Sequence, residues 1–195
     1  MIRRPPRSTL PYTTLFRSGM RDAPRAQFHS QFERNWPMKG EKKVIDALND
    51  VLTAELTAIN IYYLHYKMQE DWGYEKIAAH SKEESMGEMK HANKIIERIL
   101  FLDGAPNMAR YDEILVGNTV EQQLKNQLKI ENNHVQRLRK HIRLCVDKND
   151  FGTKEMLDEI LVETEDSVDW LETQFVRIKD VGIQNYLAEH MSTDE

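Results

Sequence analysis

Apolar residues recur three and four positions apart over four long segments of this 195-residue chain, which is the spacing of amphipathic helices. The first segment runs from Lys42 to about Trp72 and the second from about Tyr74 to Leu102. The second ends at Asp103-Gly104-Ala105-Pro106, a sequence that stops a helix. The third runs from Thr119 to about Val146 and the fourth from about Thr153 to Val181. The pattern therefore predicts four long helices.

The segments between and after these helices refine the prediction. Residues 103–118 have no helical period, and a connection of that length is typical of a crossover that lets two helices run parallel. Thr119-Val-Glu-Gln122 predicts a capping box at the start of the third helix. Ile183 to His190, which follow Gly182, predict a short terminal helix. The expected fold is all-α, a four-helix bundle with a long crossover and a short fifth C-terminal helix.

Residues 1–37 differ in composition from the rest of the chain. They hold five of the six prolines and no helical period, which predicts a disordered extension. The first eighteen residues resemble translated sequencing-adapter sequence, so the extension is interpreted as disordered or artefactual, with Met38 as the natural start. A transit peptide is the alternative, although the prolines disfavour its amphipathic helix. The domain is expected to span residues 38–195.

Charge divides along the same boundary. Residues 1–37 carry seven arginines against Asp22 and Glu33, a balance of +5, and because the whole chain carries −5 the remainder carries −10. An acidic body disfavours nucleic-acid binding and suits a protein that attracts cations. We see no apolar run of membrane-spanning length, and the single cysteine, Cys145, excludes an intrachain disulfide. These features predict a soluble, cytoplasmic protein without nucleic-acid or membrane partners.

The candidate metal ligands lie among the apolar positions that form one face, or stripe, of each predicted helix. Glu88 and His91 are three residues apart, so on a helix they leave the same face. Glu55 on the first helix and Glu131 on the third also occupy stripe positions. Buried carboxylates that converge repel one another, and a cation relieves that repulsion. Carboxylate and imidazole ligands suit iron or manganese, with zinc as a competitor. The alternative is that tyrosine hydroxyls, lysines or water satisfy these acids, or that the stripes are rotated by one position.

From Met38 onward the chain resembles the bacterioferritins, the haem-containing members of the ferritin family. The resemblance is carried by Met38-Lys-Gly, Glu88-Met-Lys-His91, Ile95-Ile-Glu-Arg-Ile-Leu-Phe-Leu-Asp-Gly-Ala-Pro-Asn107, Asp169-Trp-Leu-Glu172 and Gly182-Ile-Gln-Asn-Tyr-Leu187. It implies a ferritin-like bundle and an octahedral cage of twenty-four identical or similar subunits that stores ferric mineral. It also implies Fe(II) oxidation by dioxygen or peroxide at a di-iron centre inside each bundle.

The resemblance further implies six ligands for that centre, of which this chain keeps four: Glu55, Glu88, His91 and Glu131. On the fourth helix Thr164 stands where the second bridging glutamate belongs, and Ser167 where the second histidine belongs. Glu163 and Glu165 each lie about 100° round the helix from Thr164, so neither is expected to replace it. We therefore expect weak or absent ferroxidase activity from this chain alone, and a ferroxidase-competent partner subunit in the cage.

Two other functional hypotheses stay open. The chain could be a competent ferroxidase with a shifted or reduced di-iron site, or a non-enzymatic cage subunit that takes in and nucleates iron. A DNA-protecting mini-ferritin is disfavoured, because the candidate ligands lie within one bundle and a fifth helix follows. Whether the chain is itself an enzyme is thus undecided by the sequence.

Met89 is the candidate cofactor ligand. It follows Glu88 directly, so its side chain points about 100° away from that carboxylate, toward the outer face of the bundle. The resemblance implies that it ligates haem b between two subunits, with one thioether from each. The alternative is a packing methionine at a dimer contact. Among the remaining candidates, His134 could partly compensate for the missing ligands, and Cys145 is expected to be a buried small residue. Four histidines are expected to be solvated or satisfied at the surface: His65, His80, His141 and His190.

Overall fold

The computed structural model describes residues 39–191 of the chain, and within that range it contains five helices and no strand. The helices are α1 (Lys42–Asp71), α2 (Glu75–Phe101), α3 (Val120–Asp147), α4 (Phe151–Val181) and α5 (Ile183–Glu189). The predicted helices are confirmed, each to within two residues at either end. The interpretation of residues 1–37 concerns a segment outside the described residues.

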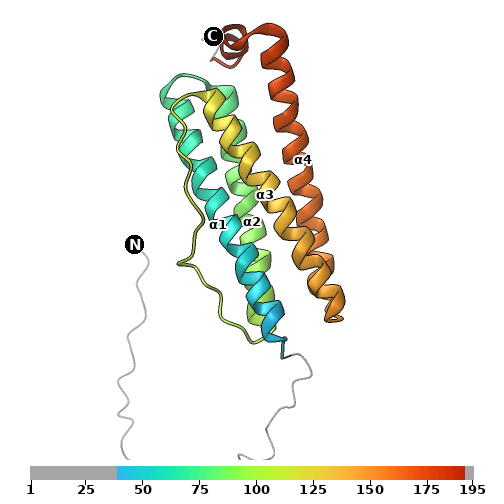
Figure 1. Ribbon diagram of the computed structural model, residues 1–195. Coiled ribbons are helices and arrows are strands. Elements are labelled where there is room, and N and C mark those ends of the chain that lie inside the picture. The colour runs from blue at the N-terminus through green and yellow to red at the C-terminus, as the bar shows by residue number, and fades with distance from the viewer. Residues whose placement is uncertain (1–38, 192–195) are drawn as a thin grey trace, which may run out of the picture. The chain divides into compact units, whose positions relative to one another are not determined.

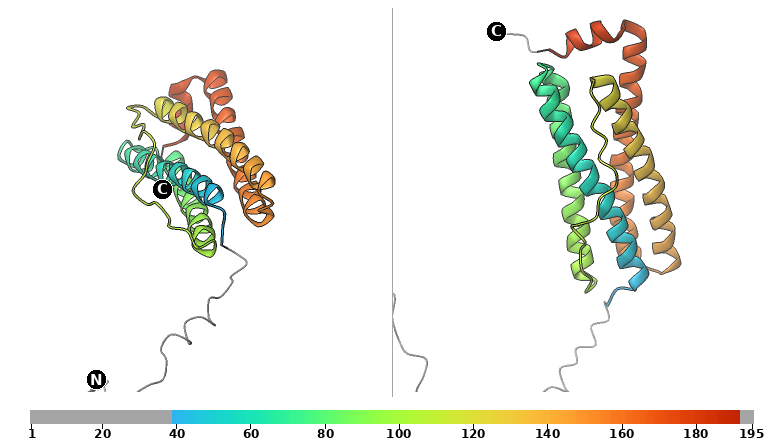
Figure 2. Two further views of the ribbon diagram at one scale, coloured as in Figure 1. Left: turned by 60° about the horizontal axis from the view of Figure 1, so that its bottom comes forward. Right: turned by 60° about the vertical axis from the view of Figure 1, so that its left-hand side comes forward.

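The helices form two antiparallel hairpins, α1 with α2 and α3 with α4, joined mainly through contacts between α1 and α3. The connection between α2 and α3 runs back along the bundle, so that these two helices point in the same direction (Figure 1). The predicted crossover is therefore confirmed. The short α5 lies across the end of the bundle where α4 finishes (Figure 2). The fold is the expected four-helix bundle with a fifth terminal helix.

The core is built from aliphatic side chains on the inward stripes of all four long helices. Several of these side chains are completely inaccessible to solvent, among them Leu48, Leu52, Ile95, Leu138 and Ile160. Burying one such side chain stabilises a fold by roughly 1.5–3 kcal/mol. A second apolar cluster, at the α5 end, joins Leu124, Leu171 and Tyr186. Polar side chains are buried among these apolar ones, including Glu55, Glu88 and Glu131.

Side-chain caps define the starts of α3 and α4. The Thr119 hydroxyl accepts the Gln122 amide at 3.2 Å, as a capping box requires, but the Gln122 side chain accepts the amide of Asn118 and not that of Thr119. Asp150 accepts the Thr153 amide at 2.9 Å, so α4 begins two residues earlier than expected. Between α4 and α5, Gly182 has a φ of 79°, a conformation that side chains with a Cβ rarely adopt.

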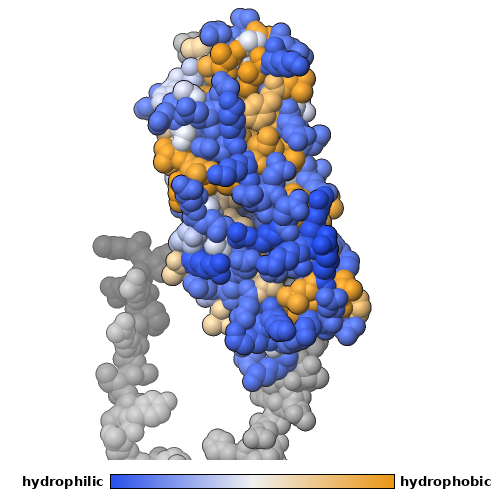
Figure 3. All heavy atoms as spheres, in the orientation of Figure 1, coloured by the Kyte–Doolittle hydropathy of each residue, from blue (hydrophilic) through white to orange (hydrophobic). Residues whose placement is uncertain are grey.

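The face of the molecule drawn in Figure 3 is mostly hydrophilic, with apolar side chains gathered in its upper half and at its lower right. None of the helices in residues 39–191 combines the length and the apolarity needed to cross a membrane.

Candidate metal centre

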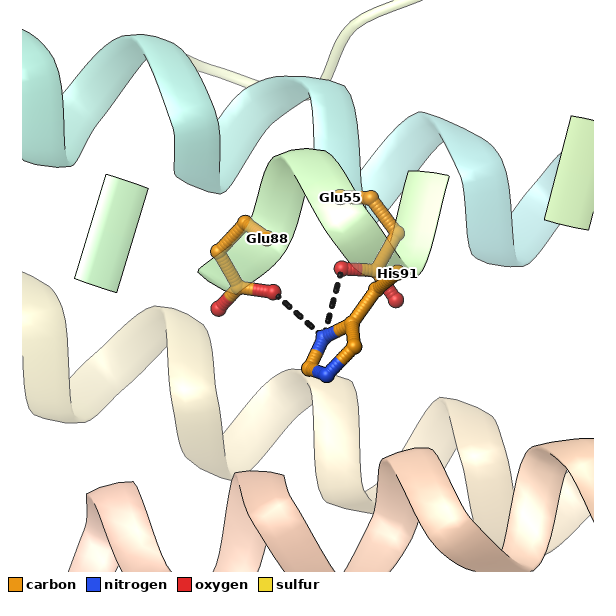
Figure 4. A group of neighbouring side chains, drawn as sticks. All are labelled: Glu55, Glu88 and His91. Carbon is orange, nitrogen blue, oxygen red and sulfur yellow. Dashed lines mark hydrogen bonds and ion pairs between the residues drawn. The ribbon is translucent and has the colours of Figure 1, made fainter. Parts of the chain in front are cut away.

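Glu55 on α1 and Glu88 and His91 on α2 meet in the middle of the bundle. Their side chains are at most 7% exposed, and one ligand atom from each lies within 4.8 Å of the others (Figure 4). His91 Nδ1 is 3.0 Å from Glu88 Oε2 and 3.6 Å from Glu55 Oε2. The spacing of three residues places Glu88 and His91 on one face of α2, and that face packs against α1. The sequence thus brings two carboxylates and an imidazole to a single point.

This cluster strongly favours a positive charge. Burial, followed by the charge of Glu55, raises the pKa of Glu88 to about 7. Burial alone would lower the pKa of His91, but the Glu55 and Glu88 carboxylates outweigh it and raise that pKa to about 11. The imidazolium form of His91 therefore supplies the charge that these acids need. A bound divalent cation would replace that proton, because a metal ligand must be deprotonated.

The helix α3 brings His134 to the cluster, with its Nε2 3.3 Å from Glu55 Oε1, whereas Glu131, the fourth predicted ligand, is not among the side chains whose ligand atoms lie within 4.8 Å of one another. Glu131 is 1% exposed, and its Oε1 accepts a hydrogen bond from the Tyr62 hydroxyl at 2.7 Å. Its Oε2 has no partner among the described residues. A tyrosine hydroxyl therefore satisfies only one oxygen of one of these acids. Burial, followed by the charge of Glu88, raises the pKa of Glu131 well above its usual range. Burial lowers the pKa of His134 to about 4, so this ring is neutral and able to ligate a cation at neutral pH.

The hydroxyls of α4 are engaged elsewhere. Thr164 is buried, and its Oγ1 donates to the carbonyl of Ile160 on the same helix at 2.8 Å. Ser167 donates to Glu84 on α2 at 2.9 Å. A hydroxyl bonded to its own backbone or to a carboxylate outside the cluster offers little to a metal. The expectation that α4 contributes no family ligand at these two positions is consistent with this geometry.

Glu163 behaves differently from what the sequence predicts. Its carboxylate reaches the cluster from α4 and lies 2.9 Å from His91 Nε2, although 56% of the side chain is exposed. The contact is to the ring nitrogen opposite the one that faces Glu55 and Glu88. The hydrogen bond to His91 lowers the pKa of Glu163. Glu165 points away and pairs with Arg139 at 2.7 Å. A long side chain can thus reach inward from a position beside the stripe, a possibility that helical angle alone does not show.

Met89 lies on the outer face of α2, as its position after Glu88 predicts. Its side chain is 48% exposed, and Met86, three residues earlier on the same helix, is 54% exposed. A soft thioether on an outward face is available to a group held between two subunits. The outward position predicted for Met89 is therefore confirmed, and its role as a haem ligand stays a prediction.

The prediction that four histidines lie at the surface is wrong for three of them. His65, His141 and His190 are buried, at 8% exposure or less. Each pairs with a polar group: His65 with the Leu115 carbonyl, His141 with Asp50, and His190 with the Tyr186 carbonyl. Such partners let a helix bury an imidazole, and a one-dimensional pattern does not reveal them. His80 is half-buried and stacks on Trp170. Cys145 is buried, as expected.

Together, the crossover bundle and its buried carboxylate–imidazole cluster define a ferritin-like protein. The family described as a ferritin-like domain matches residues 45–181 of the chain. The chain is 41% identical to the bacterioferritin of Mycobacterium bovis over 155 residues, which is 80% of this chain and 98% of that protein. It is 40% identical to the bacterioferritin of Brucella melitensis over 149 residues, 76% of this chain and 92% of that protein. The chain belongs to the bacterioferritin family.

Proposed function

We propose that this chain is an iron-storage subunit of an oligomeric cage, with Fe(II) as the cation that its buried acids attract. Membership of the bacterioferritin family supports storage and assembly. The observation that carries the proposal is the position of Glu55, Glu88 and His91, three buried ligand-forming side chains within 4.8 Å of one another. Buried acids need a counter-charge, and a bound cation would supply it in place of the proton on His91, which supports the proposal.

Iron oxidation in this proposal depends on a second, ferroxidase-competent type of subunit in the same cage. Two-metal chemistry needs both ions held at a fixed separation by ligands on either side. The α4 positions that would complete the second half of the centre carry the hydroxyls of Thr164 and Ser167, and both hydroxyls are engaged elsewhere. The chain alone is then a weak ferroxidase, and the partner subunit supplies the oxidising centre.

The second part of the proposal is that Met89 holds haem at a subunit contact. Haem ligated by two thioethers favours the reduced iron and supplies an electron-transfer group. The chain's own contribution is to present the Met89 side chain outward, one residue away from the buried ligand Glu88. This arrangement separates the haem ligand from the carboxylate cluster by the thickness of a single helix.

One observation favours an alternative, a competent ferroxidase with a shifted di-iron site. The Glu163 carboxylate already reaches His91 from α4, so this helix does bring one acid into contact with the cluster. The purified homopolymer distinguishes the two proposals. Slow oxidation of Fe(II) supports dependence on a partner, whereas rapid, biphasic oxidation overturns that dependence and supports the alternative. Iron uptake without oxidation, even beside a partner subunit, would indicate a cage component that only conducts and nucleates iron.

Haem binding is tested with two matched methionine variants in the full chain, expressed with and without a ferroxidase-competent subunit. Met89→Leu should lose haem absorbance, while Fe(II) oxidation by the mixed cage is unchanged. Met86→Leu is the control, because Met86 is similarly exposed on the same helix, and it should keep haem. Equal haem content in both variants would overturn the assignment of Met89.

A further inference from the structure

Glu55 lies between two imidazoles, one from each neighbouring helix. Its Oε2 faces His91 Nδ1 on α2 at 3.6 Å, and its Oε1 faces His134 Nε2 on α3 at 3.3 Å. Neither oxygen has a hydrogen-bond partner within residues 39–191, although the side chain is completely buried. A buried carboxylate whose two oxygens point to different nitrogen donors has the arrangement of a ligand that bridges two cations.

The α3 side of this arrangement is itself incomplete without a cation. His134 is 3% exposed, and its Nε2 has no hydrogen-bond partner in the described part of the chain. The Oε2 of Glu131, one turn before it on the same face, is also unpartnered and buried. Buried polar atoms without partners are rare, and each needs an explanation such as an ion that is bound when the protein functions.

A cavity of about 290 Å³ leads to these two side chains. It is lined by α1, α3 and the crossover, and both Glu131 and His134 contribute to its wall. Asp112 and Glu113 of the crossover also line it, together with Lys129 and Arg137 of α3, and Arg137 pairs with Asp112 at 2.7 Å. The α3 side of the cluster therefore borders a cavity that α4 does not line.

The geometry points to a second cation position between Glu55 Oε1 and His134 Nε2, which lie 3.3 Å apart, on the α3 side of the bundle and not on the α4 side. The unpartnered Oε2 of Glu131, one turn before His134, is the nearest further carboxylate on that helix face and would turn toward the ion. One carboxylate pair and one imidazole suit a divalent iron, manganese or zinc ion. The inference deepens the proposed iron handling and relies on it only for the natural identity of the cation. In this arrangement, His134 supplies the imidazole that Ser167 cannot, while no carboxylate replaces Thr164, so the centre still lacks the second bridging ligand, and the weak oxidation proposed above follows from that lack.

The test is a titration of the metal-free full-length protein with Co(II), which reports its ligands through its visible absorption. The wild type should bind a second Co(II) ion per subunit, and His134→Gln should weaken that second step by about tenfold or more. His141→Gln is the matched control, because His141 is also buried on α3 but pairs with Asp50, outside the cluster. It should keep both steps. Identical titrations for wild type and His134→Gln would overturn the inference.

A crystal of the wild-type protein soaked in Zn(II) provides a check that does not depend on any variant folding. An anomalous peak about 2.0–2.1 Å from His134 Nε2 is expected. A peak beside His91 alone, or no peak in the bundle, would overturn the inference. The proposed storage function fails separately, since it is judged from the iron content of the cage: a cage that stores iron but holds no ion beside His134 would refute this inference and leave storage intact.

Discussion

Glu163 Oε2 lies 2.9 Å from His91 Nε2, on the side of the ring that faces away from Glu55 and Glu88. A metal-binding histidine usually donates its second ring N–H to a carboxylate, which fixes the tautomer and the orientation of the ring. Glu163 occupies that position with respect to the cluster. In the proposed metal centre, Glu163 therefore acts through His91: it accepts a hydrogen bond from Nε2, which leaves Nδ1 to face the cation.

Replacing Glu163 should weaken cation binding without removing a ligand. We expect Glu163→Gln to lower the affinity for the first Co(II) ion by about 10-fold, because the ring loses its charged partner. Glu159→Gln is the control, since Glu159 lies one turn earlier on α4, is similarly exposed and also pairs with Lys94. It should bind Co(II) as the wild type does. A loss of the whole binding step in Glu163→Gln would indicate instead that Glu163 is itself a ligand.

The contribution of Glu88 to the stability of the metal-free protein should fall as pH rises from about 4.5 to about 7, opposite in sign to the contribution of His134, whose pKa is lowered to about 4. The pKa of Glu88 is raised from 4.5 to about 7, so in this window the folded chain binds more protons at this carboxyl than the unfolded chain does, and that difference favours unfolding as pH rises. The raised pKa of His91, about 11, extends the decline to higher pH. From Glu88 alone we expect a loss on the order of 1–3 kcal/mol across this window.

Urea unfolding in the presence of a chelator, at several pH values and one protein concentration, measures this effect. The stability difference between Glu88→Gln and the wild type should change with pH, because the variant lacks the titrating carboxyl and one of the charges that hold the proton on His91. Glu83→Gln, an exposed position on the same helix, should follow the wild type. If Glu88→Gln and Glu83→Gln show the same pH dependence, the buried cluster is not its source.

Helical periodicity was sufficient to predict the helices and to bring Glu55, Glu88 and His91 together, because side chains three or four apart share a face and one face must be buried. It was insufficient for Glu163, whose backbone lies beside the stripe while its long side chain reaches His91. It also missed the buried His65, which depends on a carbonyl fifty residues away. Contacts of that kind are set by tertiary structure, and no local pattern encodes them.

Asp150 should be a main determinant of how α4 begins and how it docks on α2. Its carboxylate accepts the Thr153 amide and hydroxyl, and it also pairs with Arg98 of α2 at 2.6 Å. Asp150→Ala should lower the free energy of unfolding by about 1–2 kcal/mol, since the first turn loses its cap. Asp147→Ala, at an exposed position at the end of α3, should change it by less than about 0.5 kcal/mol. Equal effects of the two substitutions would contradict a capping role for Asp150.

The hydroxyl of Tyr62 should matter most when the cluster holds no cation. It donates to Glu131 Oε1 at 2.7 Å and is the one hydrogen-bond donor to that buried carboxylate among residues 39–191. Tyr62→Phe leaves both oxygens unpartnered and should cost about 1–3 kcal/mol of stability in the metal-free protein.

Adding Co(II) should reduce that difference from the wild type, because a cation beside Glu131 replaces the lost donor. Tyr66→Phe is the control, since its hydroxyl bonds the exposed Glu70, and it should change stability by less than about 0.5 kcal/mol with or without the metal. Thermal melts of the three proteins with chelator and with Co(II) measure both effects. A Tyr62→Phe penalty that is the same in both conditions would mean that no cation approaches Glu131, and it would count against a metal on the α3 side of the bundle.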